Sequence, residues 1–260
     1  MNTALFILPL THQLNGYDAL SEDFERYLRQ LEMLGLEGQR RLRKARVVIA
    51  GVGGLGSVVS MYLVAAGVGR VILFDSGTLE LNNLNRQIIY TEEDLGTYKV
   101  AAAVKRLKKL NSEVEVIGYA EDVRSSRFRE EVSNADLIID CLDNWVSRIA
   151  VDKVSWELRK PLIHGGISEF YGQVTTVVPG ITKCLRCILN LDEEKLSTSP
   201  ERPPQVIGPT PGVVGSIEAA EAIKLITGVG ELLTNKLLII DLKRHDFTLL
   251  KLSVSDECQC

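Results

Sequence analysis

Short apolar runs and helix-type patterns of apolar and polar residues follow one another along the chain, which predicts strands separated by helices. Short apolar runs, typical of buried strands, occur at residues 47–50, 71–75, 114–117, 137–141 and 161–164. Helix patterns lie between them, at residues 54–66, 97–110 and 145–158. We expect Thr97 to cap the second of these helices. This alternation predicts a parallel sheet with right-handed crossovers.

The last third of the chain departs from this pattern. Residues 170–178 alternate apolar and polar side chains, which predicts a half-exposed antiparallel strand. A helix pattern at 213–227 follows, and then two closing strands at 237–241 and 246–252. We expect these strands to extend the parallel sheet.

The N-terminal part of the chain predicts a helix over residues 21–44, capped by Ser21 and broken around Gly35 and Gly38. The complete pattern predicts an α/β fold. It is a Rossmann-like, doubly wound, mostly parallel sheet extended by antiparallel strands, with a helical N-terminal segment.

We expect one domain over residues 21–260, preceded by an arm of residues 1–20. A crossover loop of about 188–212 interrupts it, and a cysteine-containing tail of residues 256–260 closes it. Residues 192–211 hold five of the eight prolines, which predicts an extended, mobile loop. Those prolines are Pro200, Pro203, Pro204, Pro209 and Pro211.

Composition narrows the class of protein. The formal charge of −4, from 30 basic and 34 acidic residues, argues against a nucleic-acid binder. Apolar runs fall short of the roughly 20 residues that span a bilayer, and the N-terminus lacks the features of a signal peptide. We therefore expect a cytoplasmic protein without a membrane partner, and in a reducing cytosol close cysteine pairs suggest a metal site.

A glycine-rich loop joins the first buried strand to its helix. Gly51, Gly53, Gly54 and Gly56 let phosphate approach the backbone, and the helix N-terminus supplies N–H donors. Asp75 ends the next strand, where a carboxylate can accept hydrogen bonds from ribose hydroxyls. This pattern predicts a nucleotide site but does not distinguish NAD from ATP.

Polar residues further along favour a triphosphate. Asn83 and Arg86 are three residues apart and can grip phosphates, although a solvated surface turn would have the same composition. Lys99 opposes the dipole of its helix, which a nearby phosphate would explain, whereas a snorkelling lysine is the alternative. Asp143 follows a strand at the expected ligand crevice, where a carboxylate facing phosphates needs Mg²⁺ between them. It can also cap the next helix.

Taken in order, these motifs resemble the MoeB/ThiF group of adenylyltransferases, which activate ubiquitin-like sulfur carriers and are related to ubiquitin-activating enzymes. The resemblance runs from about Arg26 to the C-terminus. Its motifs are residues 26–30, the 51–56 loop, residues 83–87, Lys99, residues 140–144, the Cys184/Cys187 pair and residues 212–216.

The resemblance implies a homodimer with two ATP sites and a reaction on the C-terminal glycine of a carrier that ends in Gly-Gly. It implies that Asp75 holds ribose, Arg86 and Lys99 hold phosphates, and Asp143 binds magnesium. Arg29 would reach into the partner subunit's site. The carrier carboxylate would attack the α-phosphate and release pyrophosphate.

The resemblance also implies a structural zinc held by four cysteines. Cys184 and Cys187 have metal-ligand spacing, and the second pair is Cys258 and Cys260. One residue separates this second pair where the family usually has two.

Two other departures from the family bear on the chemistry. The crossover loop holds no cysteine, and Cys141 reads as a small buried residue. We therefore expect adenylation without a covalent carrier intermediate, and sulfur supplied by a separate donor protein. Gly77 stands where the family often has a second acid.

Three other functions remain open. One is adenylation of a small carboxylate on a modified tRNA base, which the negative charge disfavours. Another is a NAD-dependent oxidoreductase, which explains the glycine loop and Asp75 but not Arg86, Lys99 or Asp143. The last is a non-catalytic subunit that only binds a carrier. We expect His164 to be a core or loop residue rather than a catalyst.

Overall fold

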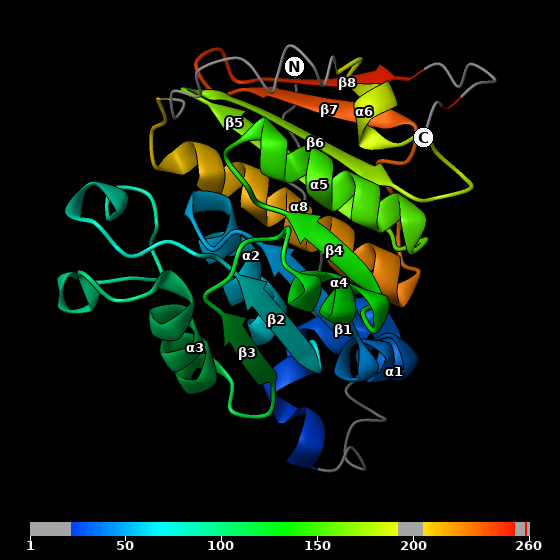
Figure 1. Cartoon of the computed structure of the whole chain (residues 1–260). Helices are drawn as coiled ribbons and strands as arrows, with labels where there is room; N and C mark the ends of the chain where they lie inside the picture. The colour runs from blue at the N-terminus through cyan, green and yellow to red at the C-terminus, as the bar shows by residue number, and fades with distance from the viewer. Residues whose placement is uncertain (1–21, 192–204, 253–257, 259–260) are drawn as a thin grey trace, which may run out of the picture.

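The computed structural model describes residues 22–191, 205–252 and 258 (Figure 1). The strands are β1 Arg46–Ala50, β2 Arg70–Phe74, β3 Glu115–Tyr119, β4 Leu137–Asp140, β5 Leu162–Ser168, β6 Tyr171–Val177, β7 Lys236–Asp241 and β8 Asp246–Lys251. The α-helices are α1 Leu28–Lys44, α2 Gly54–Ala65, α3 Lys99–Leu110, α4 Ser126–Ser133, α5 Trp145–Glu157, α6 Leu185–Ile188 and α8 Pro209–Thr227. Short 3₁₀ turns are η1 Glu22–Tyr27, η2 Leu81–Asn83 and η3 Glu92–Asp94.

The strands form one eight-stranded sheet in the order β3-β2-β1-β4-β5-β6-β7-β8. Strands β1 to β5 are parallel, and β6, β7 and β8 continue the sheet in antiparallel pairs. This is the predicted Rossmann-like sheet with its antiparallel extension. The chain passes from β1 to β2 on one side and later returns to β4 on the other. This reversal between β1 and β4 creates the crevice in which such folds bind ligands.

Both faces of the central strands are buried, because the sheet is the middle of three layers. In β1, Val47 and Ile49 pack with α1, α2, α3 and α8, whereas Val48 and Ala50 pack with α4, α5 and α6. Figure 1 shows α2 and α8 behind the sheet and α4 and α5 in front of it. A strand covered on both sides needs an unbroken apolar run, which is why β1 to β4 were readable from sequence.

The helix starts differ from the prediction in two places. Thr97 does not cap α3, which begins at Lys99 after Tyr98, and the Thr97 hydroxyl instead donates to the Asp94 carbonyl at 2.6 Å. An extended bridge between Thr78 and Tyr98 holds this segment out of the helix. The predicted break in α1 is present at Gly35, whose φ of 67° favours glycine.

Helix α8 begins at Pro209, four residues before its predicted start, so Pro209 and Pro211 belong to its first turn rather than to a loop. Proline suits that turn, because its missing N–H has no intrahelical partner there. The other three prolines of the predicted loop, the Ser21 cap and the arm lie outside the described residues.

Strand β6 is more buried than the predicted half-exposed strand, with residues 174–177 all inside. Val174 packs towards α8, and Val177 lies in the same cluster as Leu185 of α6. The polar side chains between them are satisfied, since the Thr175 hydroxyl donates to the Lys236 carbonyl at 2.8 Å. The polar positions of the alternating pattern in β6 are therefore not solvent-exposed as predicted, because their side chains are hydrogen-bonded inside the core. Among the described helices, none combines the length and apolar character that crossing a membrane requires.

Candidate active site

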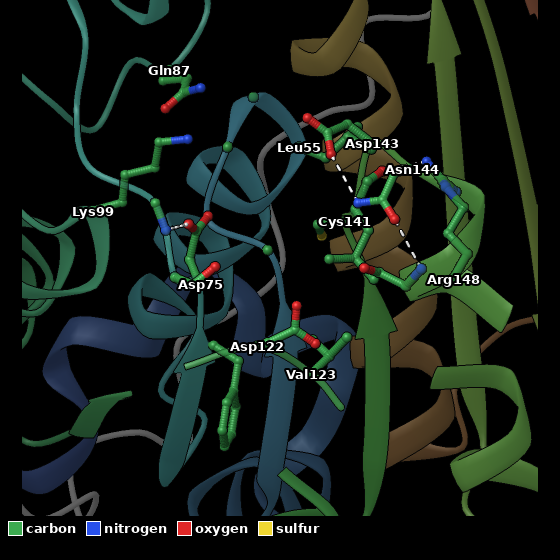
Figure 2. Close-up of a pocket in the computed structure, with 18 of the residues that line it drawn as sticks. Leu55, Asp75, Gln87, Lys99, Asp122, Val123, Cys141, Asp143, Asn144 and Arg148 are labelled. Carbon is green, nitrogen blue, oxygen red and sulfur yellow. Dashed lines mark hydrogen bonds between the residues drawn. The ribbon is translucent and has the colours of Figure 1, made fainter. Parts of the chain in front are cut away.

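A cleft of about 290 Å³ opens at the carboxyl ends of β1, β2, β3 and β4. Residues that follow each of these strands line it, together with residues from the segment after β2 and from the start of α3. Figure 2 shows Lys99 and Gln87 on one side of the cleft, Asp143, Asn144 and Arg148 on the other, and the glycine loop between them. The sheet therefore gathers at one edge residues that are far apart in sequence.

The glycine loop passes from β1 into α2 with very close backbone contacts. Gly51 has a φ of 89°, a conformation that side-chain-bearing residues rarely adopt. A Cβ on Gly56 would lie 2.0 Å from the Gly51 carbonyl oxygen, so only glycine fits there. The loop ends at Gly53, the N-cap of α2, and the first N–H groups of α2 remain available to an anion.

Asp75 lies directly after β2 and is fixed by the backbone on both sides. Its Oδ2 accepts from the Val52 N–H at 2.9 Å, and its Oδ1 accepts from the Gly77 N–H at 2.8 Å. The carboxylate is half-buried at the wall of the cleft, and each oxygen retains a lone pair. Such a group can accept hydrogen bonds from sugar hydroxyls without moving.

Lys99 lines the same wall, at the first residue of α3. Its backbone N–H donates to the Gly77 carbonyl at 3.0 Å, which places α3 beside the loop after β2. A Cβ on Gly77 would lie 3.4 Å from the Lys99 Nζ, so glycine here leaves space that the ammonium borders. Lys99 forms no ion pair within residues 22–191 and 205–252.

Arg86 is a second cation on the cleft and also lacks a carboxylate partner in the described chain. Its Nη1 donates to the Asn82 carbonyl at 2.9 Å and to the Asn85 Oδ1 at 2.8 Å, so the asparagines hold the guanidinium in place. Asn83 is turned away. It is 7% exposed, does not line the cleft, and its Oδ1 accepts from the Glu80 N–H at 3.2 Å.

Asp143 faces Lys99 across the cleft, in the loop between β4 and α5 (Figure 2). It does not cap α5, since Asn144 does so by accepting from the Ser147 N–H at 2.8 Å. The Asn144 amide also donates to Asp143 at 3.4 Å. The Asp143 carboxylate is exposed and has no cationic partner among the described residues, which suits it to bind a hard cation such as Mg²⁺.

Arg148 lines the cleft on the same side as Asp143 (Figure 2), although the sequence did not predict a role for it. It is 6% exposed, and its Nη1 lies 2.7 Å from the Gly165 carbonyl, 2.9 Å from His164 Nδ1 and 3.2 Å from Asp140 Oδ2. Its Nη2 donates to the Leu142 carbonyl. One guanidinium thus ties the loop after β4 to β5.

Burial and neighbouring charges together set the protonation states of Asp140 and His164. Burial alone would raise the pKa of Asp140, but Arg148 and His164 together hold that pKa below its usual value. Burial, with the Arg148 charge, lowers the pKa of His164, so this residue is neutral. The expectation that His164 lies in the core is confirmed, since it is fully buried and bonded on both ring nitrogens.

Cys141 is buried as expected, and its Sγ lies 4.0 Å from Glu218 Oε1 of α8. Burial, reinforced by the Asp140 charge, raises the pKa of the Cys141 thiol well above its usual value. Such a thiol is a poor nucleophile, because the thiolate is the reactive form.

Gln87 is a further cleft residue whose role the sequence did not show. It is 4% exposed, and its Oε1 has no hydrogen-bond partner among the described residues. A buried amide oxygen without a partner costs free energy, so a bound molecule that satisfies it would be stabilised. The sequence feature that could have indicated this role is that Gln87 directly follows Arg86, a predicted phosphate-binding residue.

The cysteines gather away from this cleft. The Sγ atoms of Cys184, Cys187 and Cys258 all lie within 4.8 Å of one another, and the Cys187 and Cys258 Sγ atoms are 3.7 Å apart. Thiolates bound at about 2.3 Å to a tetrahedral zinc lie about 3.8 Å apart, and the separation of the Cys187 and Cys258 Sγ atoms matches that spacing. Cys260 lies outside the described residues. Arg29 is exposed on α1 and does not line the cleft of its own chain.

Comparison with known proteins assigns the family. The ThiF family model matches residues 26–260. The chain is 39% identical over 246 residues to a sulfur carrier protein adenylyltransferase of Thermus thermophilus, covering 92% of this chain and 90% of that protein. The chain is also 34% identical over 244 residues to the heterocyst protein HesA of Trichormus variabilis, covering 91% of this chain and 88% of that protein.

A solved structure gives the same assignment. Escherichia coli MccB, crystallised with ATP, aligns with a TM-score of 0.78 at 29% identity, over 90% of this chain and 74% of that one. The family match, the curated relatives and the cleft at the switch point of the sheet agree with one another. The chain belongs to the ThiF family and is an adenylyltransferase.

Proposed function

We propose that this chain uses ATP to adenylate the C-terminal glycine carboxylate of a ubiquitin-like sulfur-carrier protein and releases pyrophosphate. The observation that carries the proposal is the charge arrangement of one cleft. Two cations without ion-pair partners in the described chain, Arg86 and Lys99, lie with the exposed carboxylate of Asp143 around the N-terminus of α2. A Mg²⁺-bound triphosphate has the charge that this arrangement accepts.

Each residue then has a specific task. Asp75 is already fixed by two backbone N–H groups and accepts hydrogen bonds from the ribose. Arg86 and Lys99 bind phosphate oxygens, and the N–H groups at the start of α2 add to the positive potential. Asp143 supplies an oxygen ligand to magnesium. Asn83 remains a weaker candidate, since its side chain is engaged in the turn.

The reaction needs positioning more than a proton-transferring side chain. The carrier's carboxylate oxygen attacks the α-phosphorus, a P–O bond to that phosphorus forms, and the bond to pyrophosphate breaks. Negative charge builds on the phosphate oxygens, and fixed cations stabilise it. The raised pKa of the Cys141 thiol agrees with adenylation that forms no covalent carrier intermediate on that residue.

The assembly follows from the same proposal. Arg29 is exposed on α1, and we assign it to the nucleotide site of the partner subunit in a homodimer. Sulfur comes from a separate donor protein after adenylation. The cysteines Cys184, Cys187, Cys258 and Cys260 hold a structural zinc that fixes the tail of the chain.

Carrier-dependent exchange of pyrophosphate into ATP tests the proposal. We expect Arg86→Ala and Lys99→Ala each to lower the exchange rate by roughly 10²–10³, as expected for removal of one transition-state charge partner. Lys105→Ala is the matched control, because this lysine is exposed further along α3. A carrier lacking its last glycine should give no exchange.

Near-normal exchange in both cleft variants would refute the assigned roles. Exchange with none of the Gly-Gly carriers, together with retained ATP binding, would instead support adenylation of a different carboxylate, such as one on a modified tRNA base.

A further inference from the structure

Tyr90 connects two parts of the cleft that bind the same molecule in the proposed function. Its ring is 6% exposed and belongs to the same buried hydrophobic cluster as Val52, Leu55 and Leu79. Its hydroxyl donates to the Val52 carbonyl of the glycine loop at 2.8 Å, across 38 positions in sequence. Sequence reasoning gave Tyr90 no role.

Val52 is held from both sides by this arrangement. Its N–H donates to Asp75 at 2.9 Å, and its carbonyl accepts from Tyr90. Burial, with the charges of Asp75 and Asp94, raises the pKa of Tyr90 well above its usual value, so the hydroxyl stays protonated and keeps donating. The peptide groups of the glycine loop are therefore fixed before any nucleotide enters.

The other end of the connection is the segment that carries Arg86. The Tyr90 N–H donates to the Gln87 carbonyl at 3.2 Å, and the Arg86 and Gln87 N–H groups both donate to the Asn83 carbonyl. Residues 83–90 thus form a continuous hydrogen-bonded unit. In the described chain, the Tyr90 hydroxyl makes the one hydrogen bond that joins residues 81–90 to residues 51–57.

We infer that Tyr90 is a positioning residue that sets the spacing between the Arg86 guanidinium and the phosphate-binding glycine loop. The inference rests on the proposed use of ATP. Both elements must contact one triphosphate, and a displacement of about 1 Å in such a site can cost 10²-fold in rate. Tyr90 is not among the residues that line the cleft, so in this inference it acts through Arg86.

A double-mutant cycle on Mg·ATP affinity tests this inference without any carrier protein. The dissociation constant is measured by calorimetry for the wild-type chain, Tyr90→Phe, Arg86→Ala and the double variant. We expect Tyr90→Phe to weaken binding about tenfold, the effect of one lost buried hydrogen bond. In the Arg86→Ala background, the same change should alter the dissociation constant by less than about twofold.

The binding stoichiometry separates positioning from folding. A purely structural defect lowers the fraction of competent molecules but leaves the dissociation constant of the rest unchanged. Tyr62→Phe is the matched control, since Tyr62 is 54% exposed on α2, and it should bind Mg·ATP as the wild type does.

Effects of Tyr90→Phe and Arg86→Ala that multiply, or an unchanged constant in Tyr90→Phe, would overturn the inference while leaving the proposed function intact. Absence of carrier-dependent exchange with a preserved cycle would overturn the carrier assignment alone. A wild-type chain that fails to bind Mg·ATP would overturn both.

Discussion

At the scale of single residues, a buried cluster of polar and charged side chains around Arg148 supports one wall of the cleft. Arg148 reaches Asp140, His164 and two backbone carbonyls from one guanidinium, and it also lies 5.3 Å from the Trp145 ring. Removing one member of such a group leaves the others desolvated and unpaired, which costs more than the pair contributes. The position of Asp143 therefore depends on Arg148, a residue to which the proposed reaction assigns no task of its own.

We predict that Arg148→Met lowers the free energy of unfolding by about 3–5 kcal/mol, because it leaves the Asp140 carboxylate buried without its cation. Urea unfolding monitored by circular dichroism measures the change. Adding Asp140→Asn to Arg148→Met should recover part of the loss, since it removes the unpaired charge. A loss below about 1 kcal/mol, the range of surface pairs, would contradict this view of the cluster.

Glu218 gives a prediction in pH. Burial, reinforced by the Asp140 charge, raises its pKa well above the usual value, and its Oε2 has no hydrogen-bond partner among the described residues. The folded protein therefore keeps a proton that the unfolded chain releases above about pH 4.3. This contribution to stability is complete below that pH and is lost as the pH rises.

The variant Glu218→Gln removes that linkage. Its stability relative to the wild type should increase from pH 4 to pH 8, by no more than about 1.4 kcal/mol per pH unit. Urea unfolding at several pH values measures the difference. A difference that stays constant over this range would show that Glu218 is ionised in the folded protein.

At the scale of elements, the junction of β1 and α2 leaves no room for a side chain at Gly56. A Cβ on Gly56 would meet the Gly51 carbonyl oxygen at 2.0 Å, whereas a Cβ on Gly212 of α8 has nothing within 4 Å. The two glycines are both helical, but they differ completely in the room around them.

We predict that Gly56→Ala abolishes measurable ATP binding and lowers the free energy of unfolding by about 1–3 kcal/mol, because the helix start must move away from the loop. Gly212→Ala should raise stability by roughly 0.5–1 kcal/mol, as alanine favours a helix interior. Calorimetric ATP binding and urea unfolding measure both variants. Retained ATP binding in Gly56→Ala would show that the loop can open without loss of the site.

Most elements were predictable because their patterns are local. Strands β1 to β5 are short apolar runs, and the glycine loop, Asp75, Arg86, Lys99 and Asp143 follow strands that end at one edge of the sheet. Helix α4 went unpredicted, although Ser125 caps it by accepting from the Phe128 N–H and its buried residues Phe128 and Val132 are four apart. Two apolar residues in eight are a weak signal.

The functions of Tyr90 and Arg148 could not be predicted in the same way. Both side chains bond backbone carbonyls that are distant in sequence, 38 positions away for Val52 and 17 for Gly165. No spacing rule links a side chain to such a carbonyl, because the fold alone brings them together. The helix cap predicted at Thr97 is wrong for a related reason, since the bridge between Tyr98 and Thr78 holds this segment extended.

At the scale of the whole molecule, the edge of the sheet that β8 forms is the part of the sheet most exposed to solvent. Strand β8 is an edge strand whose six residues are all exposed, and residue Cys258, shortly after it, returns to Cys184 and Cys187. The cysteine cluster thus fastens the chain beyond its most weakly covered strand.

We predict about one zinc per chain in the purified protein, held as a Cys₄ site. Cys187→Ser should lower the zinc content and the Tm, since metal binding contributes directly to folding free energy. Cys141→Ala is the control and should keep its zinc, because Cys141 lines the proposed nucleotide cleft and is not part of the cysteine cluster. Elemental analysis and thermal unfolding measure these quantities, and zinc-free wild-type protein would contradict the assignment.

The proposed homodimer is testable by mixing inactive variants. If Arg29 serves the partner's site, Arg29→Ala and Lys99→Ala subunits that exchange should form hybrids with one intact site of two. An equimolar mixture then recovers about a quarter of wild-type exchange activity, as random pairing in a two-fold dimer requires. No recovery, with exchange of subunits verified, would place Arg29 in its own subunit's site or outside the reaction.

The sheet order also sets when the site can exist during synthesis. Val47 of β1 pairs with Val71 on one side and with Leu137 on the other, a partner 90 positions later (137 − 47). A nascent chain that has emerged only through α3 has the glycine loop, Asp75, Arg86 and Lys99, but one side of its first strand is open to the ribosome's surroundings. The proposed site therefore lacks Asp143 until the chain beyond β4 has emerged, and until then chaperones can meet the uncovered edge of β1.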